Sequence, residues 1–451
     1  MAPKTELFND AQMQDYIAKG YVLLKVDQPA SFHQMIYERT EQVFEHMGNP
    51  GNNILPQIPE MQQVLDHPRV HGALTSILGA DYYAHPHRHC HFNPPSSEGQ
   101  GLHKDSWTRR QHRTRWAMAF YYPQDTPTER GPTGIVPGSH YYNQAPGEQV
   151  GDEIPLSGDA GTVAIVHYDL WHRAMPNATE QQRYMMKFLF VRLEEPTAPS
   201  WDCRTEEWPG GEDERMWASM WDWHRGEAAN GKANGHTMDS LLDELGEENE
   251  YTALKAAYSL GAMGRTAAAP VAARLREEDE RVRRNAGYAL TAMGHEAVSE
   301  VVQAATAADV WTRSSAVDIL GDIGLEALDT APVLKDALSH DDQSVRTPAA
   351  HSLGTVGGEE GGRVEGLVQA LADEEEWVRR YASLSLMRQG PVAKSAVDAL
   401  EQAANEDESR YVQANAARAL QRVGTPEAQD ALMRLLFVRR WCPVTGLGSK
   451  Y

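Results

Sequence analysis

The apolar residues follow different patterns in the two halves of this chain. From about Tyr251 onward they recur at helical spacing in segments that align with one another, such as "TALKAAYSLGAMG" and "VRRNAGYALTAMG". Each segment closes with glycine, the residue that commonly ends a helix. The closing residues are Gly264, Gly294, Gly324, Gly357, Gly390 and Gly424, at successive distances of 30, 30, 33, 33 and 34 residues. This regularity predicts an all-α solenoid of about six helical hairpins over residues 250–440.

The repeated pattern V-R-x-x-A-x-x-A-L-x-x-x-G resembles that of short HEAT-like repeats. The ankyrin pattern is met loosely and only once, and the W-x-x-L-G signature of tetratricopeptide repeats is absent from the sequence. Arg283, Arg346 and Arg379 recur at one place in the unit. Repeated residues more often cap a neighbouring helix or pair with an acidic loop than bind a ligand, so we expect a structural role for these arginines.

Before about Arg225 the sequence does not repeat and is rich in aromatic residues, proline and glycine. Short apolar runs such as "GTVAIVHYDL" and "YMMKFLFVRL" predict buried β-strands. The stretch "GEAANGKANGHTM" is small, polar and without periodicity, as linkers are. We therefore expect a β-domain over residues 1–225, a linker over 226–249, the helical repeats over 250–440 and a tail over 441–451.

Length and charge narrow the class of protein. The chain has 451 residues, more than one ordinary core accommodates, and a formal net charge of −22. This acidic balance argues against binding to nucleic acid or to an anionic membrane. The three cysteines lie far apart, which fits a reducing compartment, and no apolar run has the length of a membrane span or the character of a signal peptide. We expect a cytoplasmic protein.

Three H-x-D triplets are candidate metal ligands. A non-haem Fe(II) site needs two imidazoles and one carboxylate on one side of the metal, and H-x-D on a strand presents two of the three on one face. The triplet that begins at His340 lies within the repeats, where a solvated acidic turn is expected. The triplet at His167 has His224 downstream, but Gly235 occupies the position where a cation would be needed.

The triplet His103-Lys-Asp105 has the better context. His172 follows Asp105 by 67 residues, and Arg183 follows His172 by 11. A guanidinium at that place can pair bidentately with the distal carboxylate of a 2-oxoacid whose other end chelates iron. The combination predicts an Fe(II) site with a 2-oxoacid cosubstrate.

The segments around these residues resemble the phytanoyl-CoA dioxygenase family of Fe(II)/2-oxoglutarate oxygenases. The resemblance spans about residues 6–195 and includes "HFNPPSSEGQGLHKDSW", "GPTGIVPGSH" and "GDAGTVAIVHYDLWHRAMPNAT". It implies a double-stranded β-helix, a jelly-roll fold, with flanking helices. It also implies that His103, Asp105 and His172 bind Fe(II), that Arg183 anchors 2-oxoglutarate, and that O2 is the oxidant.

The sequence departs from this family at two places. Relatives often have serine where this chain has Ala174, and can have tryptophan where it has Phe120-Tyr-Tyr122. Both departures suggest altered contacts with the cosubstrate, and we predict that Tyr121 takes part in them. Because Asp105 is a carboxylate, and not the glycine or alanine that opens a halide position in some relatives, hydroxylation is favoured over halogenation.

Four histidines alternate in "AHPHRHCH", at positions 85, 87, 89 and 91. On a strand, residues i and i+4 are about 13 Å apart, so the four cannot share one metal. Pro86 indicates a sheet edge or a bulge. We predict that His89 and His91 face the barrel interior, His89 toward substrate and His91 toward cosubstrate. The alternative, that hydrogen bonds satisfy them within a polar barrel, is equally open.

Directly after Asp105, the segment "SWTRRQHRTRW" concentrates arginines in an otherwise acidic protein. A functional interpretation is capture of an anionic substrate near the iron. The predicted substrate residues of this segment are Trp107, Arg109, Arg110 and Arg113. The alternative is a solvated loop, or arginines, including Arg115, that pair with acidic side chains of the repeats.

Five of the 11 tryptophans lie between positions 200 and 226, and Trp217 and Trp221 are spaced to share one helical face. We expect them to pack between the β-domain and the repeats.

These features predict an oxidoreductase that hydroxylates a small, anionic substrate and releases succinate and CO2. Desaturation, ring formation and epimerisation use the same cofactor system and stay open. A second hypothesis is a protein-binding HEAT scaffold whose barrel is regulatory or acts on a protein partner. A third is that the repeats mediate self-association or cover the active site.

Overall fold

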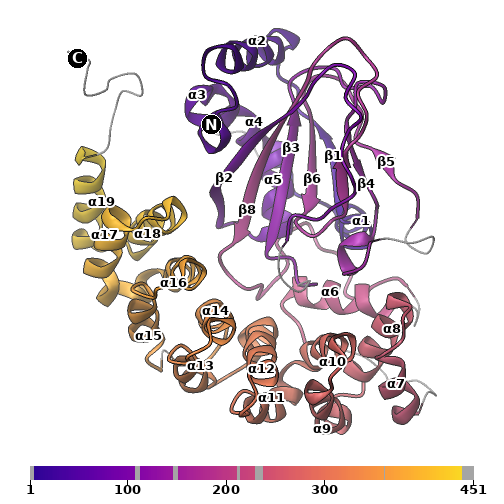
Figure 1. The fold of residues 1–451 in the computed structure, drawn as a ribbon, viewed down its shortest axis with the longest axis vertical. Coiled ribbons are helices and arrows are strands. Elements are labelled where there is room, and N and C mark those ends of the chain that lie inside the picture. The colour runs from indigo at the N-terminus through magenta and orange to yellow at the C-terminus, as the bar shows by residue number, and fades with distance from the viewer. Residues whose placement is uncertain are drawn as a thin grey trace. The chain divides into compact units, whose positions relative to one another are not determined.

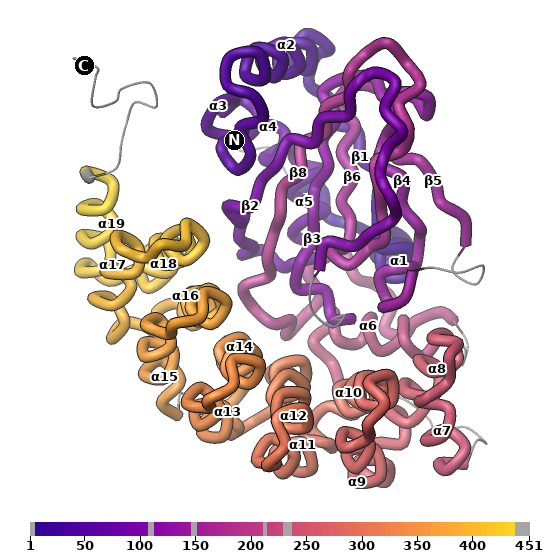
Figure 2. Tube along the Cα trace, viewed as in Figure 1, coloured from indigo at the N-terminus to yellow at the C-terminus, as the bar shows by residue number. Residues whose placement is uncertain are grey.

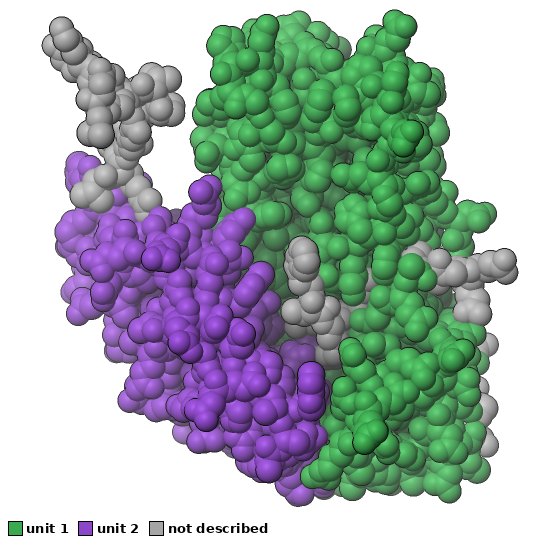
Figure 3. Space-filling model, in the orientation of Figure 1, with its two compact units in different colours: residues 1–294 green, residues 295–451 purple. Residues whose placement is uncertain are grey.

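A computed structural model describes residues 5–106, 112–145, 151–210, 214–228, 237–359 and 361–438. The chain divides into two compact units, residues 1–294 and residues 295–451, which Figure 3 shows in two colours. The described part of the chain contains no helix with both the length and the apolarity that a membrane crossing needs.

A five-stranded antiparallel sheet forms the larger layer of the first unit (Figure 1). Its strands, in spatial order, are β1 (Tyr21–Lys25), β6 (Thr162–His167), β3 (Trp116–Tyr122), β8 (Arg183–Arg192) and β2 (Tyr82–Asn93). Strands β6 and β8 are buried along their whole length, which explains why their sequences are largely apolar. Strand β2 lies at an edge, and its register shifts between Ala84 and Arg88, as Pro86 indicated.

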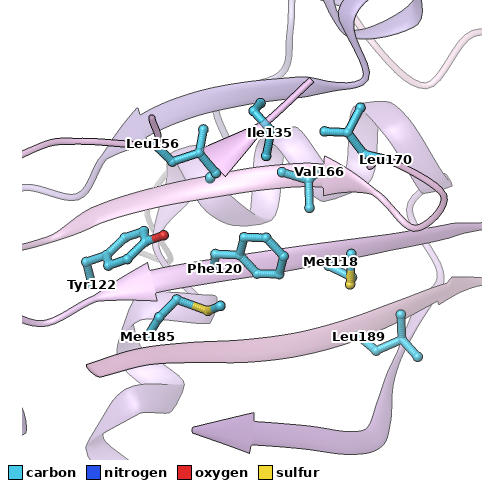
Figure 4. Close-up of a cluster of buried hydrophobic side chains, with 10 residues drawn as sticks. Met118, Phe120, Tyr122, Ile135, Leu156, Val166, Leu170, Met185 and Leu189 are labelled. Carbon is cyan, nitrogen blue, oxygen red and sulfur yellow. The ribbon is translucent and has the colours of Figure 1, made fainter. Parts of the chain in front are cut away.

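A second, three-stranded sheet packs on the first. Its spatial order is β5 (Ile154–Pro155), β4 (Thr133–Ile135) and β7 (His172–Ala174). Between the sheets lies an apolar cluster, drawn in Figure 4, made of Met118, Phe120, Tyr122, Ile135, Leu156, Ala164, Val166, Leu170, Met185 and Leu189. This arrangement confirms the predicted jelly-roll fold and identifies the inner faces of β3, β6 and β8.

Helices cover the outer face of the larger sheet. They are α1 (Asp10–Lys19), α2 (Ala30–Met47), α3 (Ile54–Gln57), α4 (Gln62–Leu65) and α5 (Pro68–Leu78). Helix α5 contacts all five strands of this sheet, and all of its residues from Gly72 to Leu78 are buried.

The first unit also contains the start of the helical region: α6 (Arg215–Arg225), α7 (Met238–Glu244), α8 (Glu250–Gly261), α9 (Arg265–Ala273) and α10 (Glu280–Met293). Helix α6 contacts both α1 and α8. Its Trp221 ring lies 5.1 Å from that of Trp201 and 6.0 Å from that of Trp208. The tryptophans therefore pack between the β-domain and the first helical repeat.

The second unit continues with paired helices, whose course is followed in Figure 2: α11 (Val298–Ala304), α12 (Val310–Ile323), α13 (Ala331–Ala337), α14 (Gln343–Ser352), α15 (Arg363–Ala370), α16 (Glu376–Gln389), α17 (Val397–Glu406), α18 (Arg410–Val423) and α19 (Pro426–Val438). Within it, α12, α14, α16 and α18 pack in succession. Gly424 ends α18 at φ 70°, a left-handed conformation that favours glycine. The predicted helical repeats are confirmed.

The recurring arginines have the structural role that was expected. Arg346 donates to both carboxylate oxygens of Asp373, at 2.8 and 3.1 Å, and to the carbonyls of His340 and Asp341. Arg379 makes the equivalent contacts to Asp407 and to carbonyls of the preceding loop. Each arginine thus joins its own repeat to the acidic loop of the next.

Candidate metal centre

Three side chains converge near the start of β7. The ligand atoms of His103, Asp105 and His172 all lie within 4.8 Å of one another, and they form the sole such group of potential metal ligands among the described residues. His103 and His172 are held together by an antiparallel bridge, in which each N–H donates to the other's carbonyl at 2.9 Å. Asp105 follows in a bend, so the triplet does not form a strand as its pattern suggested.

Each of the two histidines has its Nδ1 atom on a backbone carbonyl. His103 Nδ1 lies 3.0 Å from the carbonyl of Gly101, and His172 Nδ1 lies 2.9 Å from that of Leu170. Because a carbonyl only accepts, each Nδ1 carries the proton, and each Nε2 keeps its lone pair. Backbone carbonyls fix metal-binding histidines in this way in many proteins. The donor set therefore fits a divalent iron site.

Charge at the centre favours the protonation states that a metal requires. Burial opposes ionisation of Asp105, but the nearby ammonium of Lys187 holds the pKa of this carboxyl below its ordinary value. Burial lowers the pKa of His172. At neutral pH the centre thus contains a carboxylate and a neutral imidazole, and both are ready to bind a cation.

Lys187 is a site residue that sequence reasoning missed. It pairs with Phe120 in the register of β3 and β8, so it points into the barrel. Its Nζ lies 3.0 Å from Asp105 Oδ2, and its side chain is 8% exposed. The one available signal was a lone lysine in the apolar run "YMMKFLFVRL", four residues after Arg183 and therefore on the same face of the strand.

Arg183 is also buried inside the barrel, at 1% exposure. Its Nε donates to the carbonyl of Gly131 at 2.9 Å, and its Nη1 donates to that of His91 at 3.3 Å. Neither partner carries a charge. The guanidinium is therefore oriented by the backbone while its positive charge stays available to an anion.

The structure separates two adjacent tyrosines of β3. Tyr122 belongs to the inner cluster, and its hydroxyl donates to Thr133 Oγ1 at 2.8 Å. Tyr121 lies on the opposite face, with its hydroxyl 2.8 Å from His33 Nδ1 of α2. The structure therefore does not bring Tyr121 together with the metal ligands, and Tyr122 is the tyrosine that shares the interior with Arg183.

Two of the alternating histidines face the interior. In the register of β2 and β8, His89 lies opposite Lys187 and His91 lies opposite Met185, and paired residues share a face. The two imidazole rings are 4.8 Å apart. Burial, with the charge of Lys187, lowers the pKa of His91 to about 2, so this ring is neutral. None of the four histidines belongs to the metal group.

The described arginines after Asp105 make structural contacts. Arg115 pairs bidentately with Glu195, at 2.6 and 2.9 Å. Arg113 Nη2 lies 3.4 Å from the carbonyl of Thr291, and its guanidinium lies 6.0 Å from the ring of Trp223. Both residues are buried and their contacts are structural, but neither contact is the predicted pairing with an acidic side chain of the repeats. Trp107, Arg109 and Arg110 lie outside the described residues.

Two parts of the chain match known protein families. Residues 31–185 match the phytanoyl-CoA dioxygenase (PhyH) family, and residues 238–310, 298–362 and 364–438 match HEAT repeats. None of the curated proteins matches the chain.

Three of the similar solved structures have low sequence identity to this chain. The alpha-ketoglutarate-dependent epimerase SnoN from nogalamycin biosynthesis has 18% identity and a TM-score of 0.36 over 41% of this chain and 83% of its own. EctD from S. alaskensis with bound Fe has 18% identity and a TM-score of 0.36 over 42% and 80%. AviO1 from Streptomyces viridochromogenes Tue57 has 16% identity and a TM-score of 0.35 over 42% and 96%.

The family match and the converging ligands lead to one assignment. The chain carries a phytanoyl-CoA dioxygenase domain, an oxidoreductase of the type that uses iron and 2-oxoglutarate, followed by HEAT repeats.

Proposed function

We propose that this protein is a non-haem Fe(II)- and 2-oxoglutarate-dependent dioxygenase that hydroxylates a small anionic substrate. The observation that carries the proposal is the convergence of His103, Asp105 and His172, in which the backbone carbonyls engage both Nδ1 atoms and leave both Nε2 lone pairs for a metal. Two imidazoles and one carboxylate leave further positions on a divalent ion for other ligands.

Each residue has a role that follows from its contacts. His103, Asp105 and His172 would hold the iron, and Arg183 would bind the distal carboxylate of 2-oxoglutarate. When bound, these groups supply oxidative chemistry: O2 converts 2-oxoglutarate to succinate and CO2, and one oxygen atom replaces a C–H bond of the substrate by C–OH. Phe120, beside His172 at a ring distance of 5.9 Å, and the apolar cluster around it exclude water.

The charge balance of the interior supports an anionic substrate. Arg183 and Lys187 are both buried cations on the inner face of β8. The Asp105 carboxylate and a dianionic cosubstrate together carry one negative charge fewer than is needed to balance these two cations and a divalent ion. One positive charge remains beside Asp105, where Lys187 lies. A substrate carboxylate or phosphate would neutralise it.

The first test is anaerobic reconstitution with Fe(II) and 2-oxoglutarate, followed by the visible charge-transfer absorption of the chelate. We expect the band in the wild-type protein, its loss in His172→Ala and its weakening in Arg183→Ala. Arg173→Ala is the matched control, because Arg173 follows His172 directly but pairs with Glu153 at 2.6 Å. Absence of the band from iron-loaded wild-type protein would contradict the oxygenase assignment.

Turnover then tests hydroxylation and the substrate class. Carboxylates and their matched neutral amides are compared as stimulants of succinate formation, and products are identified by mass: hydroxylation adds one oxygen, whereas desaturation or cyclisation removes two hydrogens and epimerisation leaves the mass unchanged. A preference for the amides would contradict an anionic substrate.

We also propose the division into an oxygenase domain over residues 1–225 and a repeat domain over 250–440, in a cytoplasmic protein. The family matches at 31–185 and 238–438 support this division.

The repeats favour a protein partner as well, because Trp311 and Trp377 are 70% and 51% exposed near the starts of α12 and α16. If wild-type protein captures a partner and Trp311→Ala/Trp377→Ala does not, while the chelate band of the variant stays intact, partner binding is separate from oxygenation.

A further inference from the structure

Two helices at the start of the repeats, α8 and α10, contact a loop of the oxygenase domain. The loop consists of residues 139–144 and is called the 139–144 loop below. Glu250, the first residue of α8, is 7% exposed. Its Oε1 accepts from the backbone N–H of Asn143 and its Oε2 from that of Gln144, both at 2.9 Å. The Asn143 side-chain amide donates to Glu250 and, at 3.1 Å, to the Tyr288 hydroxyl of α10.

The same helices hold His112, which lies just before β3. The His112 ring stacks on Tyr288 at a centroid distance of 4.0 Å, and its Nδ1 lies 2.8 Å from the hydroxyl of Tyr258. Its Nε2 donates to the carbonyl of Tyr141, at 3.1 Å. His112 therefore joins α8 and α10 to the 139–144 loop a second time.

The loop leads directly to a metal ligand. Trp171 precedes His172, and its Nε1 donates to the carbonyl of Tyr142 at 3.1 Å. Its backbone N–H donates to Ser139 Oγ at 3.0 Å. Two bonds from the 139–144 loop thus fix the residue next to His172, at the point where β7 begins.

These contacts depart from the repeat pattern, which argues that they are specific. At the repeat position of Tyr258 and Tyr288, the later repeats have Asp318, His351, Leu384 and Arg418. At the position of Glu250, the next repeat has Glu280, which is exposed. Within the described part of the repeats Glu250 has one partner, Arg284 of α10, whose Nη2 lies 3.7 Å from its Oε1, and the two backbone N–H donors of the loop are additional to this contact.

We infer that α8 and α10 belong to the working oxygenase, and that Glu250, with Tyr288 and His112, is a positioning residue that acts on His172 through the 139–144 loop and Trp171. The division of the chain at residue 294, and not at the linker, agrees with this. The inference rests on the proposed metal site for its functional consequence, but the docking of the loop stands independently of that site.

The test uses the full chain and two measurements. Hydrogen exchange of the metal-free protein reports the docking of residues 139–144 and of Trp171–His172. The Fe(II)-dependent affinity for 2-oxoglutarate, from the chelate absorption, reports the site. In Glu250→Ala we expect faster exchange in both segments and an affinity about tenfold weaker, the size of effect that supporting residues have on metal centres.

Milder variants keep the test informative if Glu250→Ala unfolds. Glu250→Gln keeps one accepting oxygen and should have an intermediate effect. Tyr288→Phe keeps the stack on His112 and should have a smaller one. Glu280→Ala, at the same repeat position but exposed, should match the wild type.

The possible failures are distinguishable. If exchange rises in residues 139–144 while Trp171–His172 and the affinity stay as in wild type, the inference is overturned and the oxygenase assignment is untouched. If Glu250→Ala leaves exchange in residues 139–144 unchanged, the docking itself is refuted. If wild-type protein forms no chelate, the assigned function fails, and the exchange measurement still decides whether α8 and α10 hold the loop.

Discussion

Buried arginines in the repeats and buried cations in the barrel differ in the partners that contact them. In the second unit, Arg346 and Arg379 each have a carboxylate partner, Asp373 or Asp407, and several backbone carbonyls. In the barrel, Arg183 contacts carbonyls only, and Lys187 has one carboxylate that is also a predicted metal ligand.

The difference distinguishes charges that stabilise a fold from charges kept for a ligand. A buried cation is costly unless an anion neutralises it. The repeats complete this neutralisation within the chain, whereas the barrel leaves it to groups that bind. The comparison therefore predicts that removing a barrel cation changes the response to ligands, and that removing a repeat arginine lowers stability alone.

Loss of Arg183 should have the largest effect. In Arg183→Ala the distal carboxylate of 2-oxoglutarate would lose its partner, and truncation of one member of a buried charge pair costs about 4 kcal/mol. The affinity for 2-oxoglutarate should then fall about a thousandfold, as measured by titration of the chelate band, while thermal unfolding of the ligand-free protein changes little. Equal affinities in Arg183→Ala and wild type would show that another group anchors the cosubstrate.

Loss of Lys187 should strengthen the stabilising effect of a bound metal. Lys187→Met keeps the length of the side chain but leaves the Asp105 carboxylate without its counter-charge, which should destabilise the metal-free protein by about 3 kcal/mol. A divalent ion would restore the balance, so Mn(II) should raise the melting temperature more in Lys187→Met than in wild type.

The control for Lys187→Met is an exposed lysine–aspartate pair. Lys19 lies 2.9 Å from Asp15, with 50% and 61% of the two side chains exposed. Lys19→Met should change stability by less than about 1 kcal/mol and leave the response to Mn(II) unaltered. A response to Mn(II) in Lys187→Met no larger than in wild type would mean that Lys187 does not balance Asp105.

The repeats offer the opposite case. Arg379→Ala removes two bonds to Asp407 and those to the preceding loop, and we expect a loss of about 2 kcal/mol of unfolding free energy. The chelate band should be unchanged. Urea denaturation and chelate titration of the same sample check both statements, and a weakened chelate would break the comparison between the two regions.

Much of the architecture could be predicted because it depends on local pattern. Periodic apolar residues and closing glycines were enough to predict the repeats, and largely apolar runs were enough to predict β6 and β8. The sequence also picked out the matching family and three residues that the structure brings together, His103, Asp105 and His172, because these lie in segments with characteristic spacing. What the sequence lacks is the direction of each side chain, because a strand has two faces and only the neighbouring layers decide which one is inside.

The residues that were missed or misplaced illustrate this limit. Tyr121 and Tyr122 are adjacent and chemically alike, yet the second sheet covers only the face of Tyr122. Lys187 has the appearance of a solvent-facing residue in a strand until β2 and β3 enclose it. Arg113 lies in a basic run, and its own partners, Thr291 of α10 and Trp223 of α6, are more than a hundred residues away in the chain.

The smallest predicted effect concerns Asp342, which belongs to the H-x-D triplet of the repeats. Its Oδ1 accepts from the backbone N–H of Ser344 at 2.8 Å, at the start of α14, and this bond holds the pKa of Asp342 below its ordinary value. A carboxyl with a depressed pKa contributes stability above its unfolded pKa, about 4, and loses it as the pH falls through the folded value.

Asp342→Ala should therefore melt slightly below wild type at pH 7, and this difference should shrink when melting is repeated near pH 3. Asp342→Asn caps the helix without ionising, so its advantage over Asp342→Ala should stay constant over the same range. If that advantage also shrank, loss of charge at Asp342 would not explain the pH dependence. A constant advantage would identify this triplet as a helix cap, in contrast to the chemically similar triplet at His103, whose carboxylate is held by Lys187 beside two imidazoles.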